Sequence, residues 1–149
     1  MLSEKLQNIF ISITTEASEM VFSHVDKDDL AVGIDYATIY AQSAEEFDKI
    51  SKELKSNGTV ALERSTGDYY KLDSPISIPT GTILHCRVRR FDKEHFERGY
   101  VDFEVKNYQS FKNKYLSRLY FSLLNGEEEM VRLRDPKFTV RAYFPSGKF

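Results

Sequence analysis

The sequence predicts one α+β domain in which an amphipathic helix precedes two successive modules, each built from strands and one helix. Three observations support this fold class: an apolar stripe near the N-terminus, a strand followed by a helix and three strands within 31–92, and a similar order that restarts at residue 99. A repeat of about 65 residues is too long for a solenoid and suits two fused modules. We therefore expect a single domain over 1–149, with the helix and a linker in 1–30, a first module in 31–92 and a second, shortened module in 99–149.

The composition is that of a folded, water-soluble chain. Of the 149 residues, 41% are hydrophobic and 30% are charged, and the formal net charge of -2 supplies no long-range field that would attract nucleic acid or anionic lipid. No apolar run approaches the roughly 18 residues of a membrane-spanning helix, and the N-terminus lacks the apolar segment of a secretory signal. We therefore expect a cytoplasmic protein without membrane contact, and nucleic-acid binding is not favoured.

The N-terminal residues have the pattern of an amphipathic helix with Ser3 as its cap. Its apolar residues recur at three- and four-residue spacing: Leu6, Ile9, Phe10, Ile13, Ala17, Met20 and Val21. A stripe of this kind must be covered by another apolar surface. Two interpretations follow: the helix packs on the chain's own sheet, or it pairs with a second copy in a homodimer.

The clearest element of the first module is the helix that begins after Ser43. Ser43 and Glu46 match a capping box, and Asn57-Gly58 ends the helix. Before it, IDYATIYA (34–41) is rich in β-branched and aromatic residues, which favours a strand. Three further strands are expected at 59–64, 68–72 and 82–90.

The second module opens with GYVDFEV (99–105), in which apolar and polar residues alternate as in a half-buried strand. Asn107 can cap the next helix, whose apolar stripe runs to Leu119. Two strands are expected after it, at 129–133 and 138–144. No third strand is clearly marked, and YFSLL (120–124) is the segment that would supply it.

Four segments are similar in order and spacing to a known family. They are IDYATIYAQSAEEFDKISKELKSNG, YYKLDSPI, ILHCRVRRFD and ERGYVDFEV, within residues 30–116. They resemble the YecM-like branch of the vicinal oxygen chelate superfamily. The superfamily as a whole includes glyoxalase I and ring-cleaving dioxygenases. The resemblance implies a curled mixed sheet of paired βαβββ modules, with a divalent metal on its concave face that polarises a substrate oxygen.

Three positions depart from the metal ligands of that branch. Tyr36 stands where the branch has a histidine, Arg87 where it has a glutamate, and Asp102 where it has a second histidine. Only Asp102 is a good ligand, because a guanidinium stays charged and has no lone pair to donate. We therefore expect no metal site and no cofactor, and a divalent metal is disfavoured.

Alternation along the strands predicts a polar hollow inside the curled sheet. The side chains expected to face it are Tyr36, Thr38, Tyr40, Arg87, Arg89, Tyr100, Asp102 and Glu104. Two interpretations are compatible with each other: Arg87 forms a cross-strand ion pair with Asp102 or Glu104, or it binds an anionic or carbonyl oxygen of a ligand.

These observations predict a protein that binds a small polar or anionic metabolite and has a degenerate metal site. The expected ligand-binding residues are Tyr36, Tyr40, Arg87, Asp102, Glu104 and Arg141. The alternative is a metal-dependent lyase, isomerase or oxygenase of the same superfamily. Enzymatic activity is therefore left open, and no catalytic residue is assigned.

Other reactive side chains are weaker candidates. His85 and Cys86 are adjacent on a strand and point to opposite faces, so they cannot share a proton, and Cys86 is expected to be a small buried hydrophobe. His24 with the aspartates of 26–29 lacks the glycine and glutamate of a calcium loop, so a solvated loop is expected. His95 lies in a mixed-charge stretch that is typical of an exposed turn.

Overall fold

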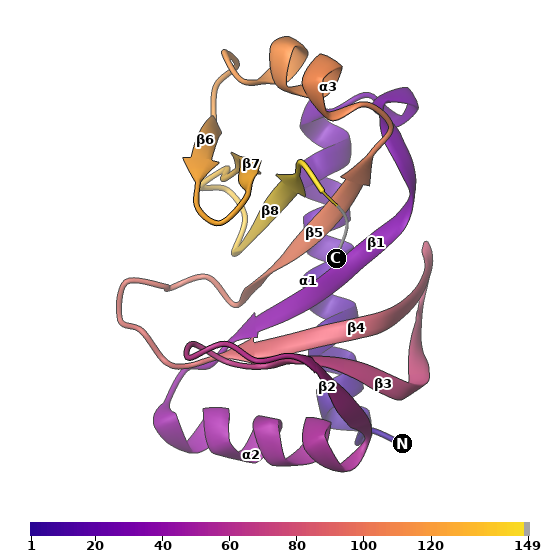
Figure 1. The fold of residues 1–149 in the computed structure, drawn as a ribbon, viewed down its shortest axis with the longest axis vertical. Helices are drawn as coiled ribbons and strands as arrows, with labels where there is room; N and C mark the ends of the chain where they lie inside the picture. The colour runs from indigo at the N-terminus through magenta and orange to yellow at the C-terminus, as the bar shows by residue number, and fades with distance from the viewer. Residues whose placement is uncertain (148–149) are drawn as a thin grey trace.

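The fold is an open, curled sheet of eight strands with a long helix across its back (Figure 1). A computed structural model describes residues 1–147, without the side chains of Val32 and Asp35. The helices are α1 (Glu4–His24), α2 (Ala44–Ser56) and α3 (Tyr108–Tyr115), and Lys27–Asp29 forms one 3-10 turn. The strands are β1 (Leu30–Tyr40), β2 (Gly58–Leu62), β3 (Tyr69–Ile78), β4 (Gly81–Arg89), β5 (Gly99–Val105), β6 (Phe121–Asn125), β7 (Glu129–Leu133) and β8 (Val140–Pro145). The predicted α+β class is confirmed.

Two halves of the same element order meet at the centre of the sheet. The strand order is β2-β3-β4-β1-β5-β8-β7-β6, so β1 and β5, the first strands of the two halves, lie side by side and run antiparallel. Each first strand pairs in parallel with the last strand of its own half, β1 with β4 and β5 with β8. In Figure 1 the half with α2 lies below and the half with α3 lies above.

Helix α1 holds the two halves together from behind. Its buried face includes Phe10, Ile13 and Ala17, which are at most 1% exposed, and it packs on β1, β3, β5 and β8. Ser3 caps the helix by accepting a hydrogen bond from the backbone N–H of Leu6. The prediction that this helix packs on its own sheet is confirmed, and the homodimer remains a prediction.

The second half is not shortened, because β6 supplies the strand that the sequence left unmarked. This strand is a five-residue edge strand that pairs only with β7, and its first four residues are all half-buried. Without alternation between buried and exposed positions, the strand leaves little trace in the sequence. The last two residues of the predicted module, 148–149, lie outside the described part of the chain.

Two element boundaries also differ from the predictions. Helix α3 ends at Tyr115, and Leu119, expected on its apolar stripe, is 72% exposed because Tyr120 turns the chain toward β6 with a φ of 73°. Strand β1 begins at Leu30, earlier than the strand expected over 34–41, and its pairing with β5 shifts register between Leu30 and Tyr36.

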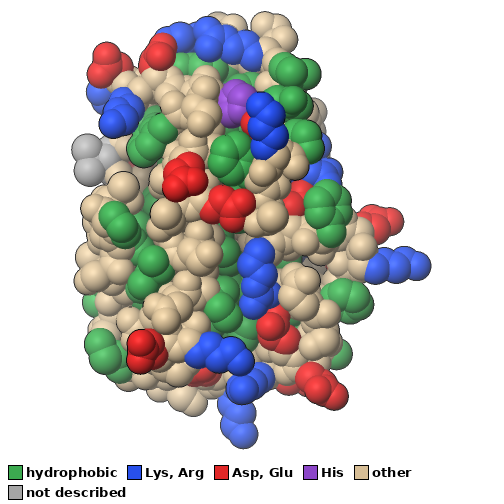
Figure 2. Space-filling view, turned by 180° about the vertical axis from the view of Figure 1, so that it is seen from behind, with side chains coloured by type: hydrophobic (Ala, Val, Ile, Leu, Met, Phe, Trp, Pro, Cys, Tyr) green, Lys and Arg blue, Asp and Glu red, His purple; other side chains and the backbone are tan. Residues whose placement is uncertain are grey.

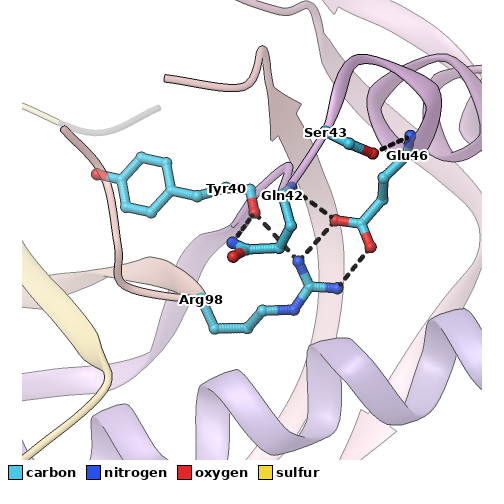
Figure 3. A network of polar contacts seen from close by, with 5 residues as sticks. All are labelled: Tyr40, Gln42, Ser43, Glu46 and Arg98. Carbon is cyan, nitrogen blue, oxygen red and sulfur yellow. Dashed lines mark hydrogen bonds and ion pairs between the residues drawn. The ribbon is translucent and has the colours of Figure 1, made fainter. Parts of the chain in front are cut away.

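The segment that joins the two halves is fixed to the start of α2 (Figure 3). Ser43 and Glu46 form the predicted capping contact, with the Glu46 N–H donating to Ser43 Oγ at 3.0 Å. The Glu46 carboxylate accepts from the Gln42 N–H at 3.0 Å and from Arg98 Nη1 at 2.7 Å. Arg98 Nη1 also donates to the Tyr40 carbonyl at 3.1 Å. Burial would raise the pKa of Glu46, but the bonds from Arg98 and Gln42 outweigh it and lower this pKa.

The surface behind the sheet carries charges of both signs. Figure 2 shows the side opposite to that of Figure 1, where acidic and basic side chains are interspersed without a broad field of one sign. None of the helices in residues 1–147 is long and apolar enough to cross a membrane.

Candidate functional site

A cavity of about 950 Å³ opens on the concave face between the two halves of the sheet. Its polar wall comes from four strands of the first half and the centre: Tyr36, Tyr69, His85, Arg87, Arg89 and Asp102. Its facing wall, from the second half, combines the apolar side chains of Leu124, Met130 and Pro145 with the acidic side chains of Glu127 and Glu128. At the edge of the cavity, Arg64 Nη2 pairs with Glu127 Oε2 at 2.9 Å and thereby connects the turns of the two halves.

Arg87 is held in the cavity wall by four hydrogen bonds. It is 5% exposed, and four of its hydrogens are donated to neutral oxygens. Nε donates to the Gly67 carbonyl at 2.9 Å, Nη1 to the Tyr69 and Tyr100 hydroxyls at 3.1 and 3.2 Å, and Nη2 to the Thr66 hydroxyl. The guanidinium carbon also lies 4.4 Å from the centre of the Tyr69 ring. These contacts fix the orientation of the cation without neutralising it.

The predicted ion pair of Arg87 with Asp102 or Glu104 is absent from the contacts of Arg87 within residues 1–147. The reason is topological, because β1 lies between β4 and β5. Arg87 is level with Thr38 on one side of β1, whereas Asp102 is level with Tyr36 on the other. Residues two strands apart are separated by about 10 Å, which is beyond the reach of a direct cross-strand pair.

Asp102 nevertheless contributes its charge to the same cavity. It is 2% exposed and lines the wall beside Tyr36. Burial and then the charge of Asp102 raise the pKa of Tyr36, and the same two causes, opposed by Arg87, raise the pKa of Tyr100 to about 12. Tyr36 and Tyr100 are therefore neutral phenols at physiological pH, and Tyr36 shares a hydrogen bond of 3.2 Å with the Tyr69 hydroxyl. The Tyr36 and Tyr69 hydroxyls line the cavity and can donate to or accept from a ligand.

Of the six residues predicted to bind a ligand, the structure brings three together on the cavity wall: Tyr36, Arg87 and Asp102. Tyr40, Glu104 and Arg141 do not line it. Arg141 instead pairs with Glu97, with Nε to Oε2 at 2.7 Å and Nη2 to Oε1 at 3.1 Å. Tyr40 is 1% exposed, and its ring stacks on that of His95 at 4.3 Å between centres.

Several lining residues were missed by the sequence-based reasoning. His85 shares the strand face of Arg87, so the alternation already pointed to it, and burial followed by the charge of Lys71 lowers its pKa, which leaves a neutral imidazole. Tyr69 is brought level with Arg87 by the register of β3 and β4, which no local pattern reveals. Thr66 comes from the turn before β3.

The other histidines and the cysteine lie in different surroundings from one another. His95 is half-buried against Tyr40 and is not in an exposed turn. His24 Nε2 lies 2.8 Å from Asp135 Oδ2, a residue 111 positions away, and not among the aspartates of 26–29. Cys86 is fully buried as predicted, and burial raises the pKa of its thiol to about 12, so the thiol is inert.

The cavity wall does not fit the metal that the family resemblance implies. Arg87 occupies the position of one expected ligand, and its fixed positive charge repels a cation. Among the side chains that the structure describes, no group of three from His, Cys, Asp or Glu comes together as a divalent metal requires. Of Tyr36, Arg87 and Asp102, which stand at the family's ligand positions, only Asp102 has a side chain suited to coordinate a metal ion. No step that passes through a metal is therefore derived for this site.

Comparison with known proteins places the fold but not the activity. No family model matches the sequence, and no curated protein matches it. A solved structure described as "Structural Genomics, Protein EC4020" is similar, with a TM-score of 0.68 over 97% of this chain and 89% of that chain, at 12% sequence identity. A likeness at this identity shows a shared fold alone.

Proposed function

We propose that this chain is a metabolite-binding protein of the vicinal oxygen chelate type that holds a small anionic molecule without a metal. The observation that carries the proposal is the guanidinium of Arg87, which is buried in the cavity wall and whose hydrogen bonds to the described residues all go to neutral oxygens. The paired order of one strand, one helix and three strands on a curled sheet supports the family assignment at the level of architecture.

Burial without a counter-ion is costly for a cation. The penalty is of the order of several kcal/mol per ion, and hydrogen bonds to neutral groups recover only part of it. A guanidinium has five hydrogens to donate, and Arg87 gives four of them to partners within residues 1–147. A carboxylate or phosphate in the cavity would supply the missing negative charge together with a charge-assisted hydrogen bond.

The rest of the wall suits a molecule with a polar head and a short apolar body. The hydroxyls of Tyr36 and Tyr69 and the neutral imidazole of His85 surround the polar end. Leu124 and Met130 face them from the second half of the sheet. Pockets for small ligands combine apolar surface with a few oriented polar groups in this manner.

Thermal denaturation with a panel of carboxylates and phosphate monoesters tests the proposal. At a ligand concentration of one hundred times Kd, the folded state gains about 2.7 kcal/mol, so binders raise Tm. We expect Arg87→Met to abolish this gain, Tyr36→Phe to weaken it and Arg118→Met, which alters an arginine outside the cavity, to leave it intact. Chelator treatment should change nothing.

Two results would contradict the proposal. One is a panel in which no anion stabilises the wild-type protein while neutral or cationic compounds do. The other is stabilisation that appears only after a divalent metal is added, which would favour the metal-dependent enzyme. Since Arg87→Met removes four hydrogen bonds, its circular dichroism spectrum and ligand-free Tm are measured first, and Tyr36→Phe serves as the milder variant.

A further inference from the structure

Arg89 lies at the junction of the main cavity and a second, smaller cleft. The cleft has a volume of about 400 Å³, and its lining includes Arg90, Lys93 and His95 from the loop between β4 and β5. Arg89 and Thr66 line both hollows, so the cleft continues the cavity along β4. The two hollows therefore offer one elongated space with arginine side chains along one side.

The guanidinium of Arg89 is uncommitted within the described chain. Among the side chains and backbone that the structure describes, it has no hydrogen-bond or ion-pair partner, and its guanidinium carbon lies 5.8 Å from the centre of the Tyr40 ring. Other arginines near the sheet are occupied: Arg98 on Glu46, Arg141 on Glu97 and Arg64 on Glu127. Arg89 is half-exposed, so its charge is available to a molecule in the cleft.

The charges around the cavity are distributed unevenly. Arg87 and Arg89 lie on β4, whereas the acidic residues of the described cavity lining are Asp102 on β5 and Glu127 and Glu128 in the turn before β7. Burial, and next the charge of Arg89, lower the pKa of His95, which also lines the cleft. Asp92, the acid within the cleft, accepts a hydrogen bond from the Glu94 N–H through Oδ1.

Arg87 and Arg89 are two residues apart on one strand, so they point to the same face with Cα atoms about 7 Å apart. We propose that the ligand is a dianion, with one anionic group at Arg87 and a second at Arg89. This inference rests on the proposed function, because Arg87 must itself face the ligand. The fitting chemical class is a linear dicarboxylate, or a carboxylate that carries a phosphoryl group at the other end.

Calorimetric titration with a dicarboxylate series tests the second anionic position. Succinate, glutarate, adipate and pimelate are compared with monocarboxylates of the same carbon number, at two fixed ionic strengths. We expect the best dicarboxylate to bind at least tenfold more tightly than its monocarboxylate, with an optimum at the chain length that spans the two guanidinium groups. Arg89→Gln should remove this gain and leave monocarboxylate binding unchanged, whereas Arg118→Gln should affect neither series.

Each alternative outcome overturns the inference. Three results would overturn the second anionic position and leave the proposed function standing. They are equal affinity for the two series, a gain that does not depend on chain length, and an equal loss for both series in Arg89→Gln. In each case Arg89 would have at most a general electrostatic effect. The absence of any binding in both series would overturn the inference, and together with a failed panel it would overturn the proposed function as well.

Discussion

Replacing Glu97 with alanine is expected to lower the free energy of unfolding by about 3–5 kcal/mol, because it breaks a buried ion pair. Glu97 is 2% exposed, and its carboxylate receives Arg141 Nε at 2.7 Å and Arg134 Nε at 2.7 Å. Without Glu97, the charge of Arg141 loses this counter-ion, although the Arg141 side chain is only 7% exposed. Urea denaturation at neutral pH measures the effect.

The matched control is Glu127→Ala, which removes a carboxylate from an exposed pair with Arg64. The Glu127 side chain is 84% exposed, so a loss of about 0.5 kcal/mol or less is expected. Losses of similar size for Glu97→Ala and Glu127→Ala would contradict the structural importance assigned to the buried pair.

The contribution of Glu97 also has a defined pH dependence. Burial would raise its pKa, but the hydrogen bonds and charge of Arg141, with the charge of Arg134, outweigh burial and hold the pKa below its ordinary value of 4.5. A carboxyl whose pKa is lower in the folded state stabilises the fold above its unfolded pKa and loses this effect as the pH falls through the folded value. The stability difference between wild type and Glu97→Gln should therefore be constant near neutrality and shrink below pH 4.5.

Gly99→Ala is expected to cost about 3 kcal/mol or more, because the added methyl group has no space. A Cβ at Gly99 would lie 2.2 Å from the Thr38 carbonyl oxygen and 2.8 Å from Ile13 Cδ1. The first of these is a backbone atom of β1, so relief requires β1 and β5 to separate at the junction of the two halves. Urea or thermal denaturation measures the loss.

Gly126→Ala provides the matched control for this substitution. The nearest atom to a Cβ at Gly126 is the Glu128 carbonyl oxygen at 3.9 Å, an ordinary van der Waals distance. A change within about 0.5 kcal/mol is expected there. If the two alanine variants were equally stable, β1 and β5 would not approach each other as closely as described.

The parts of the site that followed from the sequence are those fixed by strand alternation. A pleat of period two decides which face each residue occupies, whatever the neighbouring strands are. For this reason Tyr36, Arg87 and Asp102, from three segments far apart in the chain, could be placed in one hollow before the fold was known. The helix after Ser43 was equally accessible, because its capping box is a local pattern.

The parts that could not be predicted depend on contacts between distant segments. Alternation does not reveal that β1 separates β4 from β5, and this arrangement rules out the direct pair between Arg87 and Asp102. It also does not reveal that a loop carboxylate, Glu97, reaches an arginine 44 positions away. Arg141 was therefore expected in the ligand site, whereas the structure places it in an ion pair.

The most direct test of the central claim is an NMR titration that follows the arginine Nε–Hε groups while adipate is added. Arg87 is assigned by the loss of its signal in Arg87→Met. A saturable shift of this signal, with the same Kd as calorimetry and with the Arg118 signal unchanged, is expected if the anion binds at Arg87. An Arg87 signal that stays in place while adipate binds elsewhere would contradict the claim that this buried cation is the anion receptor.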